Sequence, residues 1–183
     1  DDFHHYIIRI LRPILQATAD SFALFASPAA PERLIRSGEQ LRNRTVQLPP
    51  LAPSPPFVDS AAARERGGYL YASRGCADCH GDNGAGRVFL DDGKGFRLAG
   101  SAIHSGPGSV VAAYRPEDWD RAIRHGVKPD GRPALVMPSE DYNRLTDEDL
   151  AALVAYVRAL PPAGGGAAVF DLPLPVRALV GAG

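Results

Sequence analysis

Several residue types that stabilise or functionalise small proteins are scarce in this 183-residue sequence, which has two cysteines, one methionine and one tryptophan. A secreted disulfide scaffold needs more cysteines. A structural zinc site needs about four ligands, which one cysteine pair and five dispersed histidines do not readily supply. No run of about 20 apolar residues is present, so no membrane-spanning helix is predicted. The net charge of −1 gives no basis for a nucleic-acid partner.

Proline and glycine are abundant, with 17 and 19 residues, and their distribution divides the chain into three regions. Residues 1–59 form an N-terminal extension that ends in a proline-rich run, which indicates an extended linker. Residues 60–162 contain the clearest helical patterns, and we expect them to form the folded domain. Residues 163–183 begin with a short glycine run, and we expect them to form an extended C-terminal tail on the domain surface.

The N-terminal extension contains two weak helical patterns. Residues 3–15 form an apolar stripe that Pro13 interrupts, and residues 31–44 form the second pattern. We expect the stripe either to dock on a partner or a membrane surface, or to pack on the folded domain or be partly disordered. The sequence starts at Asp1 rather than at methionine, from which we infer that a signal peptide or an anchor preceded it.

Three helices are predicted in the folded domain, over residues 61–74, 116–125 and 146–160. Pro116 at the start and Gly126 just past the end are typical of helix boundaries. Thr146 is the predicted N-cap of the last helix, which has one apolar face. The two intervening stretches, residues 81–107 and 127–143, are interrupted by glycine and proline and are predicted to be loops.

Both cysteines lie in residues 76–80, which read Cys-Ala-Asp-Cys-His. This spacing is the signature of c-type haem attachment, in which two thiols add across the haem vinyl groups and the next residue, histidine, binds the iron. A thioredoxin-like pair would follow a strand and would not need the histidine. We therefore predict one covalent haem c, bound through Cys76 and Cys79, with His80 as an axial iron ligand.

Met137 is the candidate for the second axial ligand. A lone methionine is usually a core residue, but Met137 lies in a predicted loop and is followed by Pro138, which favours a ligand role. The alternatives are His125, expected at a helix C-terminus, and His104, expected in an exposed loop. Ligation by histidine and methionine gives a higher reduction potential than ligation by two histidines.

These residues resemble the class I c-type cytochromes, which are small all-α domains around a haem. Gly67, Leu70 and Tyr71 are similar to the first helix of that family, whose glycine lets it cross closely against the last helix, here near Tyr156 and Val157. The resemblance implies an all-α fold around one haem, with the N-terminal extension and the C-terminal tail outside it.

A more specific resemblance, over residues 66–183, is to membrane-associated cytochromes c related to the cytochrome subunits of alcohol, gluconate and aldehyde dehydrogenases. It is carried by residues 119–132, 136–139, 142–150 and 155–162. Those subunits often carry three haems, whereas this sequence has one attachment motif. Many class I cytochromes use a proline carbonyl to accept the ring N–H of the ligand histidine. Position 92 is aspartate here, so we expect another carbonyl within residues 81–100 to accept it.

The motif and the resemblance predict an electron-transfer protein rather than an enzyme, because both axial positions of the iron would be filled. The expected partners are redox proteins or subunits of a membrane complex in a respiratory or dehydrogenase chain. Membrane association would occur through an N-terminal anchor outside this sequence or through partner subunits. Because haem c is attached outside the cytoplasm, we expect a periplasmic location, at the outer face of the cytoplasmic membrane. The alternatives are a freely diffusing carrier, and a haem enzyme or ligand sensor with an open axial site.

Several basic residues are candidates for pairing with the haem propionates or with a partner protein. They are Arg87, Arg97, Arg115, Arg121, Arg124 and Arg132. The alternative for each is an ordinary solvated surface group.

Overall fold

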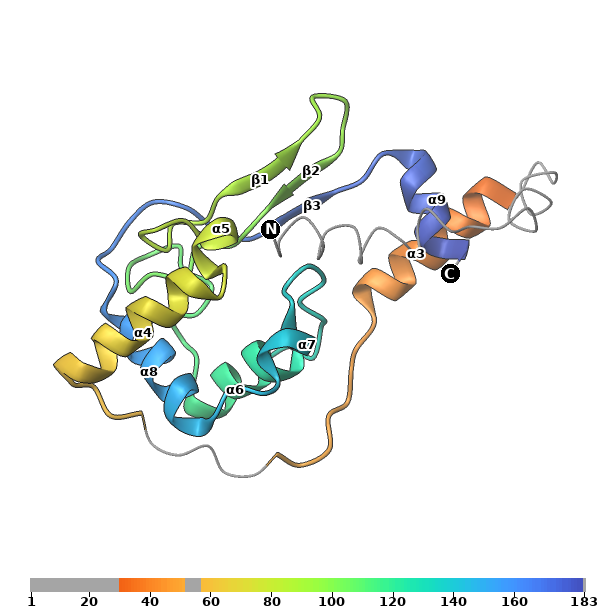
Figure 1. The fold of residues 1–183 in the computed structure, drawn as a ribbon. Helices are drawn as coiled ribbons and strands as arrows, with labels where there is room; N and C mark the ends of the chain where they lie inside the picture. The colour runs from red at the N-terminus through yellow and green to blue at the C-terminus, as the bar shows by residue number, and fades with distance from the viewer. Residues whose placement is uncertain (1–29, 52–56, 183) are drawn as a thin grey trace.

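The computed structural model describes residues 30–51 and 57–182, and this part of the chain contains seven helices and three short strands (Figure 1). The helices are α3 (Ala30–Asn43), α4 (Ala61–Ser73), α5 (Cys76–His80), α6 (Pro116–His125), α7 (Ser139–Tyr142), α8 (Asp147–Ala159) and α9 (Leu174–Ala182). The strands are β1 (Val88–Asp91), β2 (Arg97–Ala99) and β3 (Val169–Asp171). The apolar stripe at residues 3–15 and the part of the proline run at residues 52–56 lie outside the described residues. None of the described helices has the length and apolar character needed to cross a membrane.

Four helices, α3, α4, α6 and α8, occupy the segments in which the sequence predicted them. The helix α6 begins at Pro116 and is capped by Gly126, whose φ of 64° lies in the left-handed region that glycine adopts without strain. At the start of α8, the Thr146 hydroxyl accepts a hydrogen bond from the N–H of Asp149 at 3.2 Å. These end residues satisfy backbone groups that a helix leaves unpaired, so the predicted boundaries are confirmed.

The core lies where α4 crosses α8, with α6 and α7 packed against the pair (Figure 1). Leu70 of α4 and Leu150 and Val154 of α8 are almost completely buried. The same cluster includes Trp119 and Ile123 of α6. Each buried leucine, valine or isoleucine side chain contributes about 1.5–3 kcal/mol relative to an exposed one. This helical core is the part of the fold that the sequence predicted.

Gly67 lies at the closest approach of α4 and α8. A Cβ atom at this position would lie 2.6 Å from the Cβ of Tyr156 and would also overlap the main chain of Ala152. Neither contact is possible for a real side chain, so the crossing needs glycine. The close helix crossing predicted at Gly67 is confirmed, with Ala152 and Tyr156 as the contacting residues.

Replacement of Gly67 by alanine is expected to lower the free energy of unfolding by about 1–3 kcal/mol, because α4 and α8 must move apart. Alanine is otherwise preferred over glycine inside a helix by about 1 kcal/mol. A loss of stability would therefore come from the close crossing of α4 and α8. The measurement is denaturant unfolding of the protein with its cofactor bound. The matched control is Gly164→Ala, where an added Cβ meets nothing within 4 Å. A stabilised Gly67→Ala variant would contradict the close crossing.

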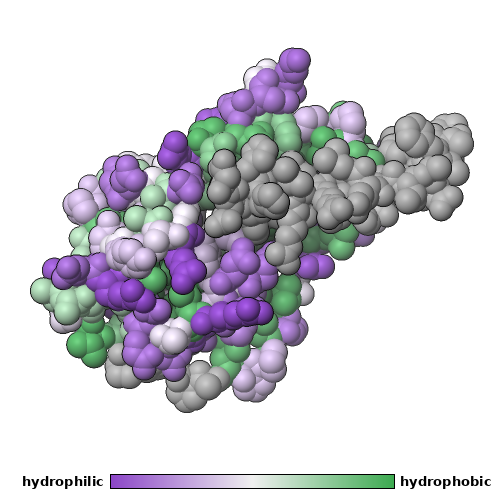
Figure 2. Space-filling model, in the orientation of Figure 1, coloured by the Kyte–Doolittle hydropathy of each residue, from purple (hydrophilic) through white to green (hydrophobic). Residues whose placement is uncertain are grey.

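The described part of the chain is mainly helical, as predicted, but it also contains three short strands that the all-α prediction did not include. The stretch 81–107, predicted to be a loop, contains an antiparallel hairpin in which Leu90 of β1 pairs with Leu98 of β2. In its turn, the Asp92 carboxylate accepts hydrogen bonds from the N–H groups of Lys94 and Phe96 at 2.8 and 2.9 Å. Figure 2 shows hydrophilic side chains at the projecting tip of this hairpin. An Asp-Gly pair between two apolar runs is a hairpin signal, which the glycine content of the stretch obscured.

The prediction of an extended tail over residues 163–183 is also wrong for part of this range. Strand β3 pairs with β2 and completes a sheet in the order β1-β2-β3, and α9 packs against α3 (Figure 1). At this helix contact, a Cβ at Gly181 would overlap the Leu34 carbonyl, and Arg177 forms an ion pair with Glu39. Proline is tolerated in the first turn of a helix, so Pro175 does not prevent α9 from forming. The N-terminal extension and the tail therefore pack on each other.

Candidate cofactor site

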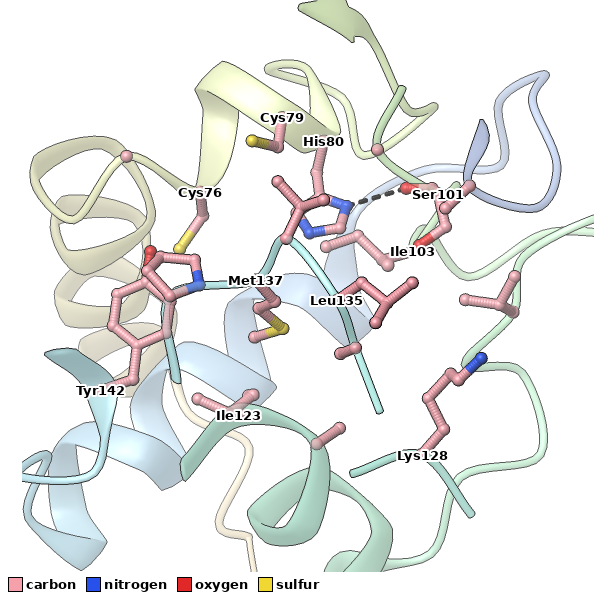
Figure 3. Close-up of a pocket in the computed structure, with 18 of the residues that line it drawn as sticks. Cys76, Cys79, His80, Ser101, Ile103, Ile123, Lys128, Leu135, Met137 and Tyr142 are labelled. Carbon is pink, nitrogen blue, oxygen red and sulfur yellow. Dashed lines mark hydrogen bonds between the residues drawn. The ribbon is translucent and has the colours of Figure 1, made fainter. Parts of the chain in front are cut away.

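A cavity of about 1750 Å³ lies between α5, the segment before α6, and the segment that leads into α7. Cys76, Cys79, His80 and Met137 all line this cavity (Figure 3). Its wall also contains the apolar side chains of Ile103, Val111, Ile123, Leu135, Leu153 and Val157. Small-molecule pockets usually measure about 300–1,000 Å³, so this cavity has room for a larger group. The structure thus brings the four predicted site residues to one large and mainly apolar space.

The helix α5 that carries the two cysteines is a single turn fixed to the core on both sides. On its N-terminal side, the Tyr142 hydroxyl donates a hydrogen bond to the Arg74 carbonyl at 2.7 Å. On its C-terminal side, the Tyr71 hydroxyl donates to the Gly81 carbonyl at 2.6 Å. Both tyrosines are themselves buried in the helical core. The two cysteines therefore occupy a fixed position at the edge of the cavity.

The two cysteine sulfurs are not bonded to each other. Burial raises the pKa of the Cys76 thiol and of the Cys79 thiol to about 11 each. Both side chains are therefore protonated at neutral pH. A redox-active Cys-X-X-Cys pair depends instead on a thiol with a lowered pKa. The surroundings of this pair thus give no support to a thioredoxin-like role and are compatible with attachment of a cofactor.

His80 is oriented by a hydrogen bond between its Nδ1 and the carbonyl oxygen of Ser101, at 2.8 Å. Because a carbonyl only accepts, Nδ1 carries the proton and Nε2 keeps its lone pair. Burial lowers the pKa of His80, although the bond to Ser101 opposes the shift, so the ring is neutral. Neutral imidazole with one nitrogen held by a carbonyl is the usual state of a metal-binding histidine. The acceptor was expected within residues 81–100, and Ser101 lies one residue beyond.

Met137 lies on a short segment whose backbone is fixed on both sides. Its N–H donates to the Ala134 carbonyl at 3.2 Å, and its carbonyl accepts from the Ser139 N–H at 2.8 Å. The Ser139 hydroxyl then donates to the Ala122 carbonyl of α6 at 3.3 Å. Figure 3 shows the Met137 thioether in the same pocket as the His80 ring. The backbone of Met137 is thus held in place, and its side chain packs against the edge of the hydrophobic core.

The two alternative histidines lie elsewhere. His104, expected in an exposed loop, is only 1% exposed. Its Nδ1 accepts from the Gly106 N–H at 2.9 Å and its Nε2 donates to the Gly164 carbonyl at 3.1 Å. His125 ends α6, as predicted, with Nε2 4.0 Å from an Asp120 carboxylate oxygen. Neither ring is among the described side chains that line the cavity.

Basic side chains at the cavity were only partly anticipated from the sequence. Of the six arginines proposed as propionate partners, only Arg132 lines the cavity within the described residues. Arg42, Arg74, Lys128 and Arg144 also line it, and none of them was singled out from the sequence. Arg74 lies just before α5 and Arg144 just after α7, whereas Lys128 follows α6 and Arg42 belongs to the last turn of α3. Arg42 was missed because the extension was treated as separate from the folded domain. The signal for Lys128 was its position shortly before Met137, in the stretch that resembles other cytochromes.

A helical core, a Cys-X-X-Cys-His turn fixed at the edge of a large apolar cavity, and a methionine in the same cavity together define a c-type cytochrome. Comparison with protein families agrees with this class. The model of the family described as cytochrome c oxidase, cbb3-type, subunit III matches residues 62–157. The chain belongs to this family, and membership implies haem c, with its iron, as the cofactor.

The chain is also similar to cytochrome subunits of dehydrogenases, which confirms the more specific resemblance seen in the sequence. It is 32% identical to the fructose dehydrogenase cytochrome subunit of Gluconobacter japonicus over 157 residues, which cover 77% of this chain and 30% of that protein. It is 32% identical to the cytochrome c subunit of alcohol dehydrogenase (quinone) of Gluconacetobacter polyoxogenes over 108 residues, which cover 55% of this chain and 22% of that protein. A diheme cytochrome c-type of Cereibacter sphaeroides is 26% identical over 65% of this chain and 43% of its own length. The chain therefore spans less than half the length of these relatives.

Proposed function

We propose that this chain transfers single electrons through one haem c, bound covalently by Cys76 and Cys79 and ligated by His80 and Met137. The observation that carries the proposal is that these four side chains line one cavity. When bound, the haem supplies a one-electron redox couple. The chain's own residues then set how firmly the cofactor is held, how it is oriented and how much water reaches it.

The residues present fit such a cofactor. The Cys76 and Cys79 thiols provide two attachment points on a turn that Tyr71 and Tyr142 fix in place. The neutral ring of His80 offers its Nε2 lone pair, because Ser101 holds the proton on Nδ1. The apolar wall excludes water, and exclusion of water is one of the means by which a protein adjusts a reduction potential. A thioether from Met137 as second ligand leaves no open axial position, which favours electron transfer over catalysis.

We further propose that the chain works with a dehydrogenase or respiratory complex on the periplasmic side of the cytoplasmic membrane. The support is the similarity to proteins named as cytochrome subunits of fructose and alcohol dehydrogenases. Its partners would be redox proteins or subunits of that complex, and membrane association would come from them or from an anchor outside this sequence. Residues 60–162 would then form the haem domain, while residues 1–59 and 163–183 flank it.

The ligand assignment can be tested by the near-infrared spectrum of the oxidised protein. We expect a weak long-wavelength band from charge transfer between methionine sulfur and iron. Replacement of Met137 by alanine should abolish this band and lower the reduction potential, because the thioether favours ferrous iron. The matched control is Leu135→Ala, which removes a neighbouring side chain that lines the same cavity but has no donor atom.

Two results would contradict the assignment. A wild-type spectrum typical of two histidine ligands would point to a histidine in place of Met137, and His104 and His125 would be the residues to replace next. A high-spin spectrum would indicate an open axial site, and the haem enzyme or ligand sensor would then become the better proposal. An unchanged band in Met137→Ala would exclude Met137, the only methionine in this chain, as the sulfur ligand.

A further inference from the structure

The backbone of Lys128 is held at the cavity by a small hairpin that leads toward Met137. The Lys128 N–H donates to the Arg132 carbonyl at 2.9 Å, and the Gly131 N–H donates to the Lys128 carbonyl at 2.8 Å. Val127 and Pro133 close the hairpin as an isolated antiparallel bridge. Figure 3 shows the Lys128 side chain across the pocket from Cys76 and Cys79. The hairpin thus presents a cation at the end of the cavity away from the attachment residues.

The N-terminal extension adjoins this hairpin. The Val46 N–H donates to the Gly131 carbonyl at 2.8 Å, and a Cβ at Gly131 would lie 2.7 Å from the Thr45 methyl carbon. This contact follows directly after the end of α3, where Arg42 and Asn43 line the cavity. The extension is held on its other side by α9, which packs against α3. Two segments far apart in the sequence therefore build one end of the cavity.

The charges at this end are incompletely paired within the described structure. Arg132 forms an ion pair with Asp130 at 2.7 Å, and the charge of the partly buried Lys128 also acts on Asp130. Among the described residues, no ion pair within 4 Å occurs for Lys128 or for the exposed Arg42. The acidic side chains that line the cavity, Asp78, Asp141 and Asp171, belong to α5, α7 and β3. Three cations, Lys128, Arg132 and Arg42, thus face one nearby carboxylate, Asp130, and the partial burial of Lys128 is unfavourable unless a further anion compensates its charge. The cavity end thus has the chemistry of a carboxylate-binding site.

We propose that Lys128 and Arg42 bind the two carboxylates of the cofactor, so that the N-terminal extension completes the cofactor site. This inference rests on the proposed function, since those carboxylates belong to haem. The thiols of Cys76 and Cys79 hold one edge of the cofactor, and the cations lie where the remaining part of the cavity must accommodate its charged edge. The extension, expected from the sequence to serve in docking or anchoring, thereby becomes part of the electron-transfer unit.

The pairing has a measurable consequence for the redox couple. Reduction adds one negative charge, which nearby cations stabilise, so Lys128 and Arg42 raise the reduction potential. Lys128→Gln and Arg42→Gln should each lower the reduction potential in a redox titration of the intact protein. Lys128→Arg keeps the positive charge, so its potential should stay close to that of the wild type. The Lys128 shift should persist at about 1 M salt, because screening, with a length of ~3 Å there, acts less on partly buried pairs than on exposed charges.

Each variant has a matched control that changes the net charge equally. Lys94→Gln removes the only other lysine of the chain, at the exposed tip of the β1–β2 hairpin. Arg36→Gln removes an exposed arginine of α3, which does not line the cavity. Neither control should move the potential at high salt.

The outcomes separate this inference from the proposed function. Potentials of Lys128→Gln and Arg42→Gln equal to those of their controls would overturn the inference, while an intact haem c spectrum with its near-infrared band would leave the proposed function standing. A Lys128→Gln shift that disappears at high salt would also overturn it, since the shift would then come from fully screened charges. A shift for Lys128 alone would overturn the role of the extension. Failure to find haem c would overturn both proposals.

Discussion

The chain with Cys76 and Cys79 both replaced by alanine should retain no haem after denaturation and should lose its cooperative thermal unfolding transition. The reason is the cavity of about 1750 Å³, which lies beside the helical core. Without the haem, the mainly apolar wall of this cavity would be open to water and its side chains would lose their packing partner. The total stability of a domain is only about 5–15 kcal/mol, so we expect this loss of packing to remove the cooperative fold.

The measurements are haem staining on a denaturing gel and thermal unfolding followed by circular dichroism. The matched control is Asp78→Asn, which alters an exposed residue of the same turn without removing a thiol. It should keep the haem stain and unfold near the wild-type temperature. A double variant that unfolds cooperatively at the wild-type temperature would show that the cavity does not depend on a covalently bound group.

The chemistry of the site could be predicted from the sequence because it depends on neighbouring residues. The spacing of Cys76, Cys79 and His80 is set within one turn of chain, so the sequence contains the whole arrangement. The ends of α6 and α8 were predictable for the same reason. Pro116, Gly126 and Thr146 satisfy or terminate the helix through contacts with residues a few positions away.

The features that the sequence did not predict depend on contacts between distant segments. Ser101 became the acceptor for His80 because the chain turns back at Gly86, whose N–H donates to the His80 carbonyl at 2.8 Å. His104 is buried because Gly164 of the tail returns to meet its ring. No local periodicity encodes either contact.

The same dependence on contacts between distant segments explains why the structure of the two ends of the chain was not predicted. Taken alone, residues 31–44 are a weak helix and residues 163–183 resemble an unstructured tail. The helices α3 and α9 are stabilised by each other, through the close approach of Gly38 and Gly181. Strand β3 is stabilised by its pairing with β2 of the folded domain. Most helical stability in proteins comes from packing rather than from intrinsic propensity. The assignment of Arg42 to the cofactor site therefore required the folded structure.

Gly100 links the sheet to the cofactor site, and its replacement by alanine should affect both stability and potential. A Cβ at Gly100 would overlap the Cys79 carbonyl oxygen and would lie 3.2 Å from the Cys79 Cβ. Relief of this overlap requires the end of β2 to move away from α5. We expect the free energy of unfolding to fall by about 1–3 kcal/mol. Chemical denaturation of the protein with haem bound measures this change.

The effect on the potential follows from the residue next to Gly100. Displacement of the Ser101 carbonyl weakens its hydrogen bond to His80 Nδ1, now 2.8 Å long. That bond makes the ring a stronger electron donor at Nε2, so its loss should make ferric iron less stable and raise the reduction potential. The shift is opposite in sign to the one expected for Lys128→Gln. Gly166→Ala, whose added Cβ meets nothing within 4 Å, is the matched control and should change neither quantity. An unchanged potential together with reduced stability would show that Ser101 keeps its contact and that only the packing of β2 on α5 was disturbed.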